Sequence, residues 1–251
     1  MNKHLIIVSR QFLRVNVFSS DFFVFISRRF FMLVYFFIIG SILGSFAAAL
    51  FSRNSNGESI LSARSHCDYC KKIILFRDLI PIFSYLFLTG KCRYCKRNIG
   101  PFTFICELGF ALIWLTSYSL FHSVILNIIL SIMIYLSIED ISNKSVHFPY
   151  ILCLFIFSLI YNFNPLMDFI YILFYLLISL INHHKEMLGS GDIDFILILM
   201  IINNVIDTLK IVLIGSCVCL ICLVLTNKLR ARVPFIPFLL LGYLIIICIK
   251  K

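Results

Sequence analysis

The feature that most constrains this chain is a succession of apolar stretches, each close to the length that crosses a bilayer. A transmembrane helix needs about 20 mostly apolar residues. Hydrophobic residues make up 61% of the chain and charged residues 14%, whereas a soluble domain has about 25% charged residues. We therefore predict an all-α polytopic membrane protein with about eight transmembrane helices, several of them short: Met32–Phe51, Phe102–Leu120, His122–Ile138, Pro149–Tyr161, Leu166–Ile181, Ile193–Val205, Lys210–Leu225 and Pro234–Ile249.

One polar segment, Ser52–Gly100, interrupts this pattern and holds nine of the 22 Lys and Arg residues. The positive-inside rule places it in the cytoplasm. Threading eight helices from there puts Asp140–His147, Asn182–Gly191 and Asn227–Arg232 on the same side, with 14 positive residues inside and eight outside. Membrane orientation therefore accounts for the net charge of +10 better than nucleic-acid binding does, and we expect no nucleic-acid partner.

The N-terminal residues 1–31 do not fit this threading. Five of the eight outside charges lie there, and Arg28-Arg29 directly precedes the first predicted helix. Two explanations are open. Either residues 16–27 form an extra interfacial or membrane segment, or translation starts at Met32. A cleavable signal peptide is disfavoured, because the apolar run after Arg29 is too long and no small-residue cleavage site follows it.

Two CxxC pairs lie in the polar segment, Cys67–Cys70 and Cys92–Cys95, with 21 residues between them. This spacing is close to that of four-cysteine zinc sites, and four thiolates complete a tetrahedron without an open position. Disulfides and redox chemistry are the alternatives. A cytoplasmic loop disfavours disulfides, and a thioredoxin-like site needs one CxxC in a βαβ context. We predict structural zinc, and interpret the other six cysteines as small apolar residues in helices.

Two aspartates end up at the same membrane face although the threading did not use them. Asp140 lies at the end of the third predicted helix, and Asp192 follows Gly189-Ser-Gly191 at the start of the sixth. Two neighbouring carboxylates share one proton, so one can activate a water while the other donates a proton to a peptide bond. Helix capping or solvation is the alternative reading for each.

Other polar residues compete for these roles. Glu139 adjoins Asp140, Asp194 follows Asp192 by two residues, and Glu107 lies within the second predicted helix. His183-His184 suggests a solvated loop, because no spaced metal-binding partners accompany it. Glu139, Asp194 and Glu186 are candidate contacts for a basic peptide.

Taken together and in order, these motifs resemble the type IV prepilin peptidase family, over roughly residues 38–242. The resemblance rests on GSILGSF at 40–46, GESI at 57–60 with SHCDYC at 65–70, DLIP at 78–81, CRYC at 92–95 leading to Glu107, GSGD at 189–192 and PFIPF at 234–238. It implies an aspartic endopeptidase with Asp140 and Asp192 as catalytic residues, supported by Gly189 and Gly191. It implies zinc on Cys67, Cys70, Cys92 and Cys95.

The resemblance also implies the substrate and the location. Family substrates are prepilins or pseudopilins whose short basic leader ends in Gly before an apolar helix. Many members then N-methylate the new N-terminal residue with S-adenosylmethionine. The expected location is the bacterial inner membrane, in contact with lipid, with the active site at the cytoplasmic face.

Five positions depart from the family pattern. His147 stands at a usual Pro, Asp194 at a usual Lys and Ile236 at a usual Gly, while Lys96 and Asn98 replace Gly and Pro after the last cysteine pair. The first three leave the expectation of peptidase activity in place. The changes near the cysteines weaken the expectation of methylation.

We divide the chain into an N-terminal extension at 1–31, a first transmembrane helix at 32–51, a cysteine domain at 52–101 and a membrane peptidase domain at 102–251. Two other classes are alternatives to the peptidase. A transporter would place acids near helix midpoints, which only Glu107 approaches. A membrane scaffold docked through a zinc ribbon would depend on the cysteines and not on the aspartates.

Overall fold

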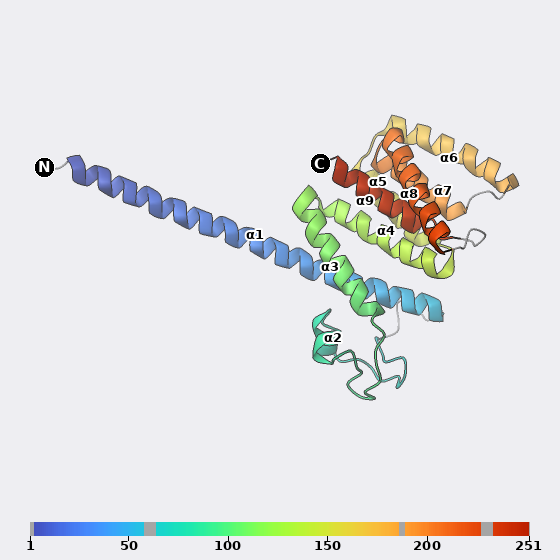
Figure 1. Ribbon diagram of the computed structural model, residues 1–251, viewed down its shortest axis with the longest axis horizontal. Coiled ribbons are helices and arrows are strands. Elements are labelled where there is room, and N and C mark those ends of the chain that lie inside the picture. Colours follow the sequence, from blue (N-terminus) through green and yellow to red (C-terminus); the bar gives the residue numbers. More distant parts are fainter. Residues whose placement is uncertain (1–2, 58–63, 186–188, 227–232, 251) are drawn as a thin grey trace. The chain divides into compact units, whose positions relative to one another are not determined.

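The computed structural model describes residues 3–57, 64–185, 189–226 and 233–250, and it divides into two compact units, residues 1–122 and 123–251. The first unit holds α1 (Lys3–Asn56), the 3-10 helix η1 (Phe76–Leu79), α2 (Phe83–Phe87) and α3 (Phe102–Phe121) (Figure 1). The second holds α4 (Val124–Asn143), α5 (Phe148–Tyr161), α6 (Pro165–Lys185), α7 (Ser190–Ile202), α8 (Val205–Thr226) and α9 (Ile236–Ile249). No strand occurs in the described residues.

The first unit is built on the crossing of α1 and α3 (Figure 1). Two glycines, Gly40 and Gly44, bring the backbones together. A Cβ atom built on Gly44 would lie 2.6 Å from the carbonyl oxygen of Cys106, and one on Gly40 would lie 2.7 Å from that of Phe110. Small residues four apart permit such close approach of membrane helices, so this pair fixes where α3 crosses α1.

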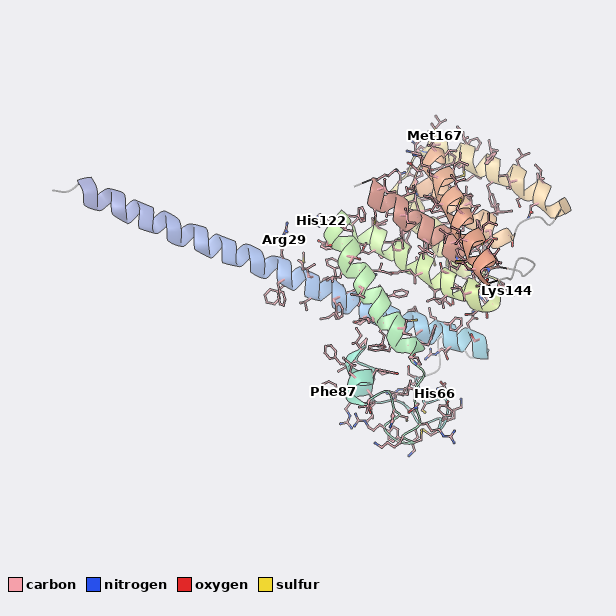
Figure 2. The ribbon with its side chains drawn as sticks, in the orientation of Figure 1. Arg29, His66, Phe87, His122, Lys144 and Met167 are labelled. Carbon is pink, nitrogen blue, oxygen red and sulfur yellow. The ribbon has the colours of Figure 1, made fainter. Side chains whose placement is uncertain are left out.

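The cysteine segment connects α1 to α3 and lies at the Phe102 end of α3. Its residues His66 and Phe87 lie together on that side in Figure 2, away from His122, which ends α3 in the left-handed conformation. Two isolated bridges, His66 with Ile73 and Lys91 with Asn98, pair its backbone. The insertion predicted between the first two long helices is therefore confirmed.

The helices α4 and α7 are among the most deeply buried of the second unit. On α4, Ile129, Met133 and Leu136 have no exposed surface, and on α7 Leu199 is equally buried. By contrast, α6 carries large exposed apolar side chains such as Phe174 and Leu177. Such an exposed apolar surface is typical of membrane-spanning helices and of protein-interaction sites.

The two ends of this unit differ in what they bring together. At one end, the last turn of α4 meets the first residue of α9, since the Asp140 carboxylate accepts a hydrogen bond from the Ile236 N–H at 3.1 Å. At the other end, Asp207 of α8 pairs with Lys250, directly after α9, at 2.5 Å. Asp140 and Asp207 are thus separated by the length of α9, about 20 Å at 1.5 Å per residue.

The observed helices follow the predicted stretches closely, with three differences. The described backbone of α1 is helical through residue 31, where we placed a boundary. α4 continues one turn beyond Ile138 to Asn143. Among the described residues, five helices are long and apolar enough to cross a membrane, α5 and α9 are shorter apolar helices, and α7 has 13 residues. The all-α multi-pass class is confirmed, whereas the number of spans remains a prediction.

The close crossing of α1 and α3 makes a specific prediction. Gly44→Val should destabilise the first unit by about 1–3 kcal/mol, the usual range for overpacking, because the new side chain meets backbone that cannot move aside. Gly109→Val on α3 is the matched control, since a Cβ there meets no atom within 4 Å. Thermal unfolding of the purified protein measures both, and equal stability of the two variants would contradict this packing.

Candidate functional site

The four predicted cysteines form one cluster in the first unit. Their sulfur atoms all lie within 4.8 Å of one another, and the Cys67 and Cys95 sulfurs are 3.9 Å apart. Zinc bound to thiolates at about 2.3 Å in a tetrahedron requires sulfur separations of about 3.8 Å. The cluster can therefore hold a metal ion of that kind with little rearrangement.

The two CxxC pairs have the same local backbone. The Cys67 N–H donates to the Lys72 carbonyl at 3.0 Å, and the Cys92 N–H donates to the Arg97 carbonyl at 2.9 Å. The residue after each pair, Lys71 or Lys96, has a left-handed backbone with φ of 55° or 58°. Glycine adopts this conformation without strain, which explains why the Lys96 position is usually Gly in the family pattern.

Backbone N–H groups near Cys92 favour its charged form. The N–H of Cys95 is the main cause that lowers the pKa of Cys92 to about 7, whereas burial and the neighbouring thiols raise the pKa of Cys95 to about 11. Thiolates, and not thiols, bind metals. The fold of the second pair therefore favours Cys92 as a metal ligand.

A turn between the two cysteine pairs is tied to Glu107 of α3. Ile82 has φ of 64° and ψ of −55°, the strained geometry of the rare γ-turn, and Phe83 N–H closes it on the Pro81 carbonyl at 2.6 Å. The Ile82 N–H points to Glu107 and donates to its Oε2 at 2.6 Å. Glu107 is thus a buried acceptor that holds the strained turn against α3.

A second charged contact stabilises the same segment. Arg93, between Cys92 and Cys95, donates two hydrogen bonds to the carboxylate of Asp78, at 2.7 Å and 2.5 Å. The Asp78 side chain is 7% exposed, and the Arg93 hydrogen bonds lower its pKa. This pair connects the DLIP motif directly to the second CxxC pair.

A cavity of about 480 Å³ opens between these elements in the first unit. It is lined by α1, by both cysteine pairs and by α3, with the charged residues Arg53, Asp68, Lys72 and Glu107 on its walls. Small-molecule sites commonly measure about 300–1,000 Å³. The cavity has the size and the mixed charge that suit a small zwitterionic or cationic ligand.

In the second unit, the structure brings Asp140 and Asp192 near enough for their charges to interact. Asp140 lies in the last turn of α4 and is 7% exposed, while Asp192 lies in the first turn of α7 and is partly exposed. A Cβ on Gly189 would lie 2.9 Å from the Asp192 carboxylate. The two predicted residues therefore lie at the same end of the second unit, where a Cβ on Gly191 would lie 2.3 Å from Val146 of the loop after α4, although 52 positions separate them in the sequence.

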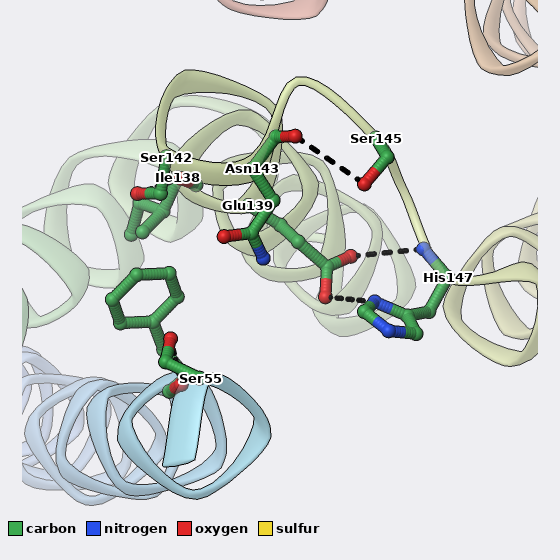
Figure 3. A network of polar contacts seen from close by, with 8 residues as sticks. Ser55, Ile138, Glu139, Ser142, Asn143, Ser145 and His147 are labelled. Carbon is green, nitrogen blue, oxygen red and sulfur yellow. Dashed lines mark hydrogen bonds and ion pairs between the residues drawn. The ribbon is translucent and has the colours of Figure 1, made fainter. Parts of the chain in front are cut away.

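Glu139 has a different environment from its neighbour Asp140. It has no exposed surface and accepts two hydrogen bonds from His147, one from the backbone N–H at 3.1 Å and one from Nδ1 at 2.6 Å (Figure 3). A fully buried carboxylate is not available to a basic peptide, so our expectation of that role for Glu139 does not fit the structure. Sequence reasoning noted His147 as unusual but did not identify this pair.

Asp194 faces α6 and not the aspartate pair. It accepts a hydrogen bond from the Tyr175 hydroxyl at 2.6 Å and lines a mostly apolar groove with residues of α5 and α6. Two residues along a helix point about 200° apart, which separates Asp194 from Asp192. Glu58–Ile60 of the GESI motif, Glu186 and Asn227–Arg232 lie outside the described residues, as do the side chains of His183 and His184.

The Asp78–Arg93 pair makes a prediction about stability and pH. Because the pKa of Asp78 is lowered from 3.8 in the folded protein, its stabilisation is present above that value and is lost as the pH falls further. Asp78→Asn should therefore increase hydrogen exchange of residues 76–93 at pH 7, and the difference from wild type should shrink near pH 3. The exchanged pair Asp78→Arg with Arg93→Asp should recover part of the protection, and failure of every variant to change exchange would contradict the account.

Comparisons with known proteins match these two units separately. The model of the bacterial peptidase A24 N-terminal domain matches residues 38–121, and the model of the type IV leader peptidase family matches residues 127–224. Prepilin leader peptidase/N-methyltransferases are similar over shorter stretches. The one from Bacillus subtilis is 42% identical over 69 residues, which cover 28% of each chain. The one from Vibrio cholerae is 39% identical over 89 residues, which cover 32% of this chain and 35% of the relative.

The matched stretches thus span about a third or less of these curated relatives. No solved structure matches the chain. The two family matches meet at the boundary between the two compact units, and each contains one of the two clusters described above. The chain belongs to the type IV leader peptidase family.

Proposed function

We propose that this chain cleaves the basic leader of type IV prepilins or pseudopilins after Gly, at the cytoplasmic face of the bacterial inner membrane. The observation that carries the proposal is that Asp140 and Asp192 lie at one end of the second unit, where Gly191 packs against Val146 of the loop after α4. The names of the similar proteins, prepilin leader peptidases, give the substrate class. The position of the pair at helix ends supports reaction at the membrane surface.

The proposed mechanism uses the two carboxylates as general base and general acid. Two carboxylates brought close together hold one proton between them. The ionised aspartate takes a proton from the attacking water, and the protonated one donates to the carbonyl oxygen or the leaving nitrogen. The Asp140 carboxylate is oriented by the Ile236 N–H, and this chemistry requires no metal and no covalent intermediate.

Substitution of the pair tests this proposal. Asp140→Asn and Asp192→Asn should each abolish leader cleavage, assayed with a prepilin in membranes that contain each variant. Asp194→Asn is the matched control, because Asp194 lies on the same helix but bonds to Tyr175, and it should retain cleavage. Full cleavage by both aspartate variants would contradict the catalytic assignment and favour Glu107, Glu139 or Asp194 as the catalytic acid, or the scaffold alternative.

We propose zinc as the ion of the cysteine cluster, with a structural role. The sulfur separations fit its coordination, and four cysteine ligands leave no open position for chemistry. The ion would fix the two CxxC loops relative to each other. The cluster belongs to the first unit, whereas both proposed catalytic residues belong to the second.

The zinc assignment predicts one zinc per chain by elemental analysis. Cys92→Ser should remove it, while Cys106→Ser, another buried cysteine, should retain it. Cys67→Ser should reduce the stability of the first unit, or methylation, more than leader cleavage. Loss of cleavage in a well-folded Cys67→Ser protein would contradict the structural role.

We further propose that the cavity in the first unit serves N-methylation of the new N-terminal residue, with S-adenosylmethionine as the methyl donor. When bound, this cofactor supplies an activated methyl group. The cavity residues fit it, because Glu107 and Asp68 present negative charge towards a cationic ligand, and Arg53 and Lys72 suit its carboxylate. Glu107 is buried and keeps its carboxylate at the cavity wall through the Ile82 N–H.

Glu107→Gln tests this placement, since the amide can still accept the Ile82 N–H while the charge is lost. Methylation should fall by about tenfold or more, as expected for an interaction with a charged group worth about 1.5–3 kcal/mol. Leader cleavage should be retained, and mass spectrometry of the mature N-terminus measures both activities. Unchanged methylation would exclude Glu107 from the donor site.

A further inference from the structure

The short loop after α4 is closed by a ring of hydrogen bonds. Glu139, in the last turn of α4, binds both the backbone N–H and the Nδ1 atom of His147, eight residues later (Figure 3). His147 is also the residue that directly precedes α5. Within the loop, the Ser145 hydroxyl donates to the Asn143 carbonyl at 3.4 Å. The conformation of residues 144–147 therefore depends mainly on the Glu139–His147 pair.

This loop lies directly against the turn that presents Asp192. A Cβ atom built on Gly191 would lie 2.3 Å from Cγ2 of Val146, so only a glycine permits this approach. Val146 is adjacent to His147, and Gly191 is adjacent to Asp192. A displacement of the loop would thus be transmitted through Gly191 to the Asp192 backbone.

The same pair is connected to Asp140 through the other end of the loop. Glu139 and Asp140 are consecutive residues of α4, and both are buried. A buried carboxylate is stabilised by the hydrogen bonds that it accepts, and His147 supplies two of them to Glu139. The pair therefore lies in a continuous line of contacts from Asp140 through Val146 to Asp192.

The residue type at position 147 decides how the loop is held. Proline, which the family pattern usually has here, fixes its own φ and has no N–H to donate. His147 offers two donors instead, and Glu139 accepts both. This chain therefore uses a hydrogen-bonded pair where a proline would make the loop rigid.

We infer that Glu139 and His147 are positioning residues for leader cleavage. They hold residues 144–147 against the Gly189–Asp192 turn and so set how Asp140 and Asp192 face each other. Neither residue takes part in the proton transfers. The inference rests on the proposed peptidase function and adds a pair that acts through the catalytic aspartates.

Steady-state cleavage of a prepilin by the full-length protein in proteoliposomes tests the inference. Glu139→Gln and His147→Ala should each lower kcat by about tenfold or more with little change in KM, since a 1 Å misplacement of reacting groups costs about 100-fold. The double variant should be no slower than the slower single variant, because both remove one interaction. Ser145→Ala, on the same loop, should keep the wild-type rate.

Hydrogen exchange of residues 144–148 provides a second measurement that does not depend on activity. Exchange should rise in Glu139→Gln and His147→Ala but not in Ser145→Ala. If the wild type is active, either of two results would overturn the inference alone. The first is an unchanged kcat in both single variants, and the second is a loss of kcat in the double variant that equals the product of the two single losses. A wild type that cleaves no prepilin would overturn the proposed function as well, and unchanged exchange would overturn the hydrogen-bonded loop itself.

Discussion

The arrangement of the second unit depends on how two adjacent carboxylates are accommodated at the end of α4. The C-terminal end of a helix carries partial negative charge and is unfavourable for acidic side chains. Glu139 and Asp140 lie in this last turn, and both are buried. Each therefore requires donors from elsewhere in the chain.

The beginnings of other helices supply these donors. Asp140 accepts from the first residue of α9, Glu139 accepts from the residue that precedes α5, and Asp192 lies in the first turn of α7. N-terminal ends carry free N–H groups and partial positive charge. The convergence of three helix beginnings on the end of α4 thus explains both the fold of this end and the closeness of the two aspartates.

Much of this architecture is accessible from the sequence. Apolar stretches predict the long helices, the spacing of the cysteines predicts one cluster, and charge bias predicts that residues 140–147 and 189–192 share one end. The hydrogen bond from Ile236 to Asp140 could not be predicted, because every residue except proline has a backbone N–H and the residue type therefore does not identify the donor. The sequence is sufficient to show that Asp194 points away from Asp192, since residues two apart on a helix diverge by about 200°. It is not sufficient to show the role of Glu139. In the sequence, an acid beside a catalytic candidate at a helix end is compatible with solvent exposure and with burial. Only the return of the chain at His147 shows that Glu139 is buried.

The most direct test of the account is whether positions 140 and 192 meet in the membrane-embedded protein. A double variant with Asp140→Cys and Asp192→Cys, in a chain whose other cysteines outside the CxxC pairs are replaced, is oxidised in the membrane. After the loop between the two positions is cleaved, the two fragments stay together only if a disulfide has formed. The account predicts an efficient cross-link for this pair and none for Asp140→Cys with Asp207→Cys, since Asp207 lies at the other end of α9. Absence of the first cross-link, or equal formation of both, would contradict a shared site for the two aspartates.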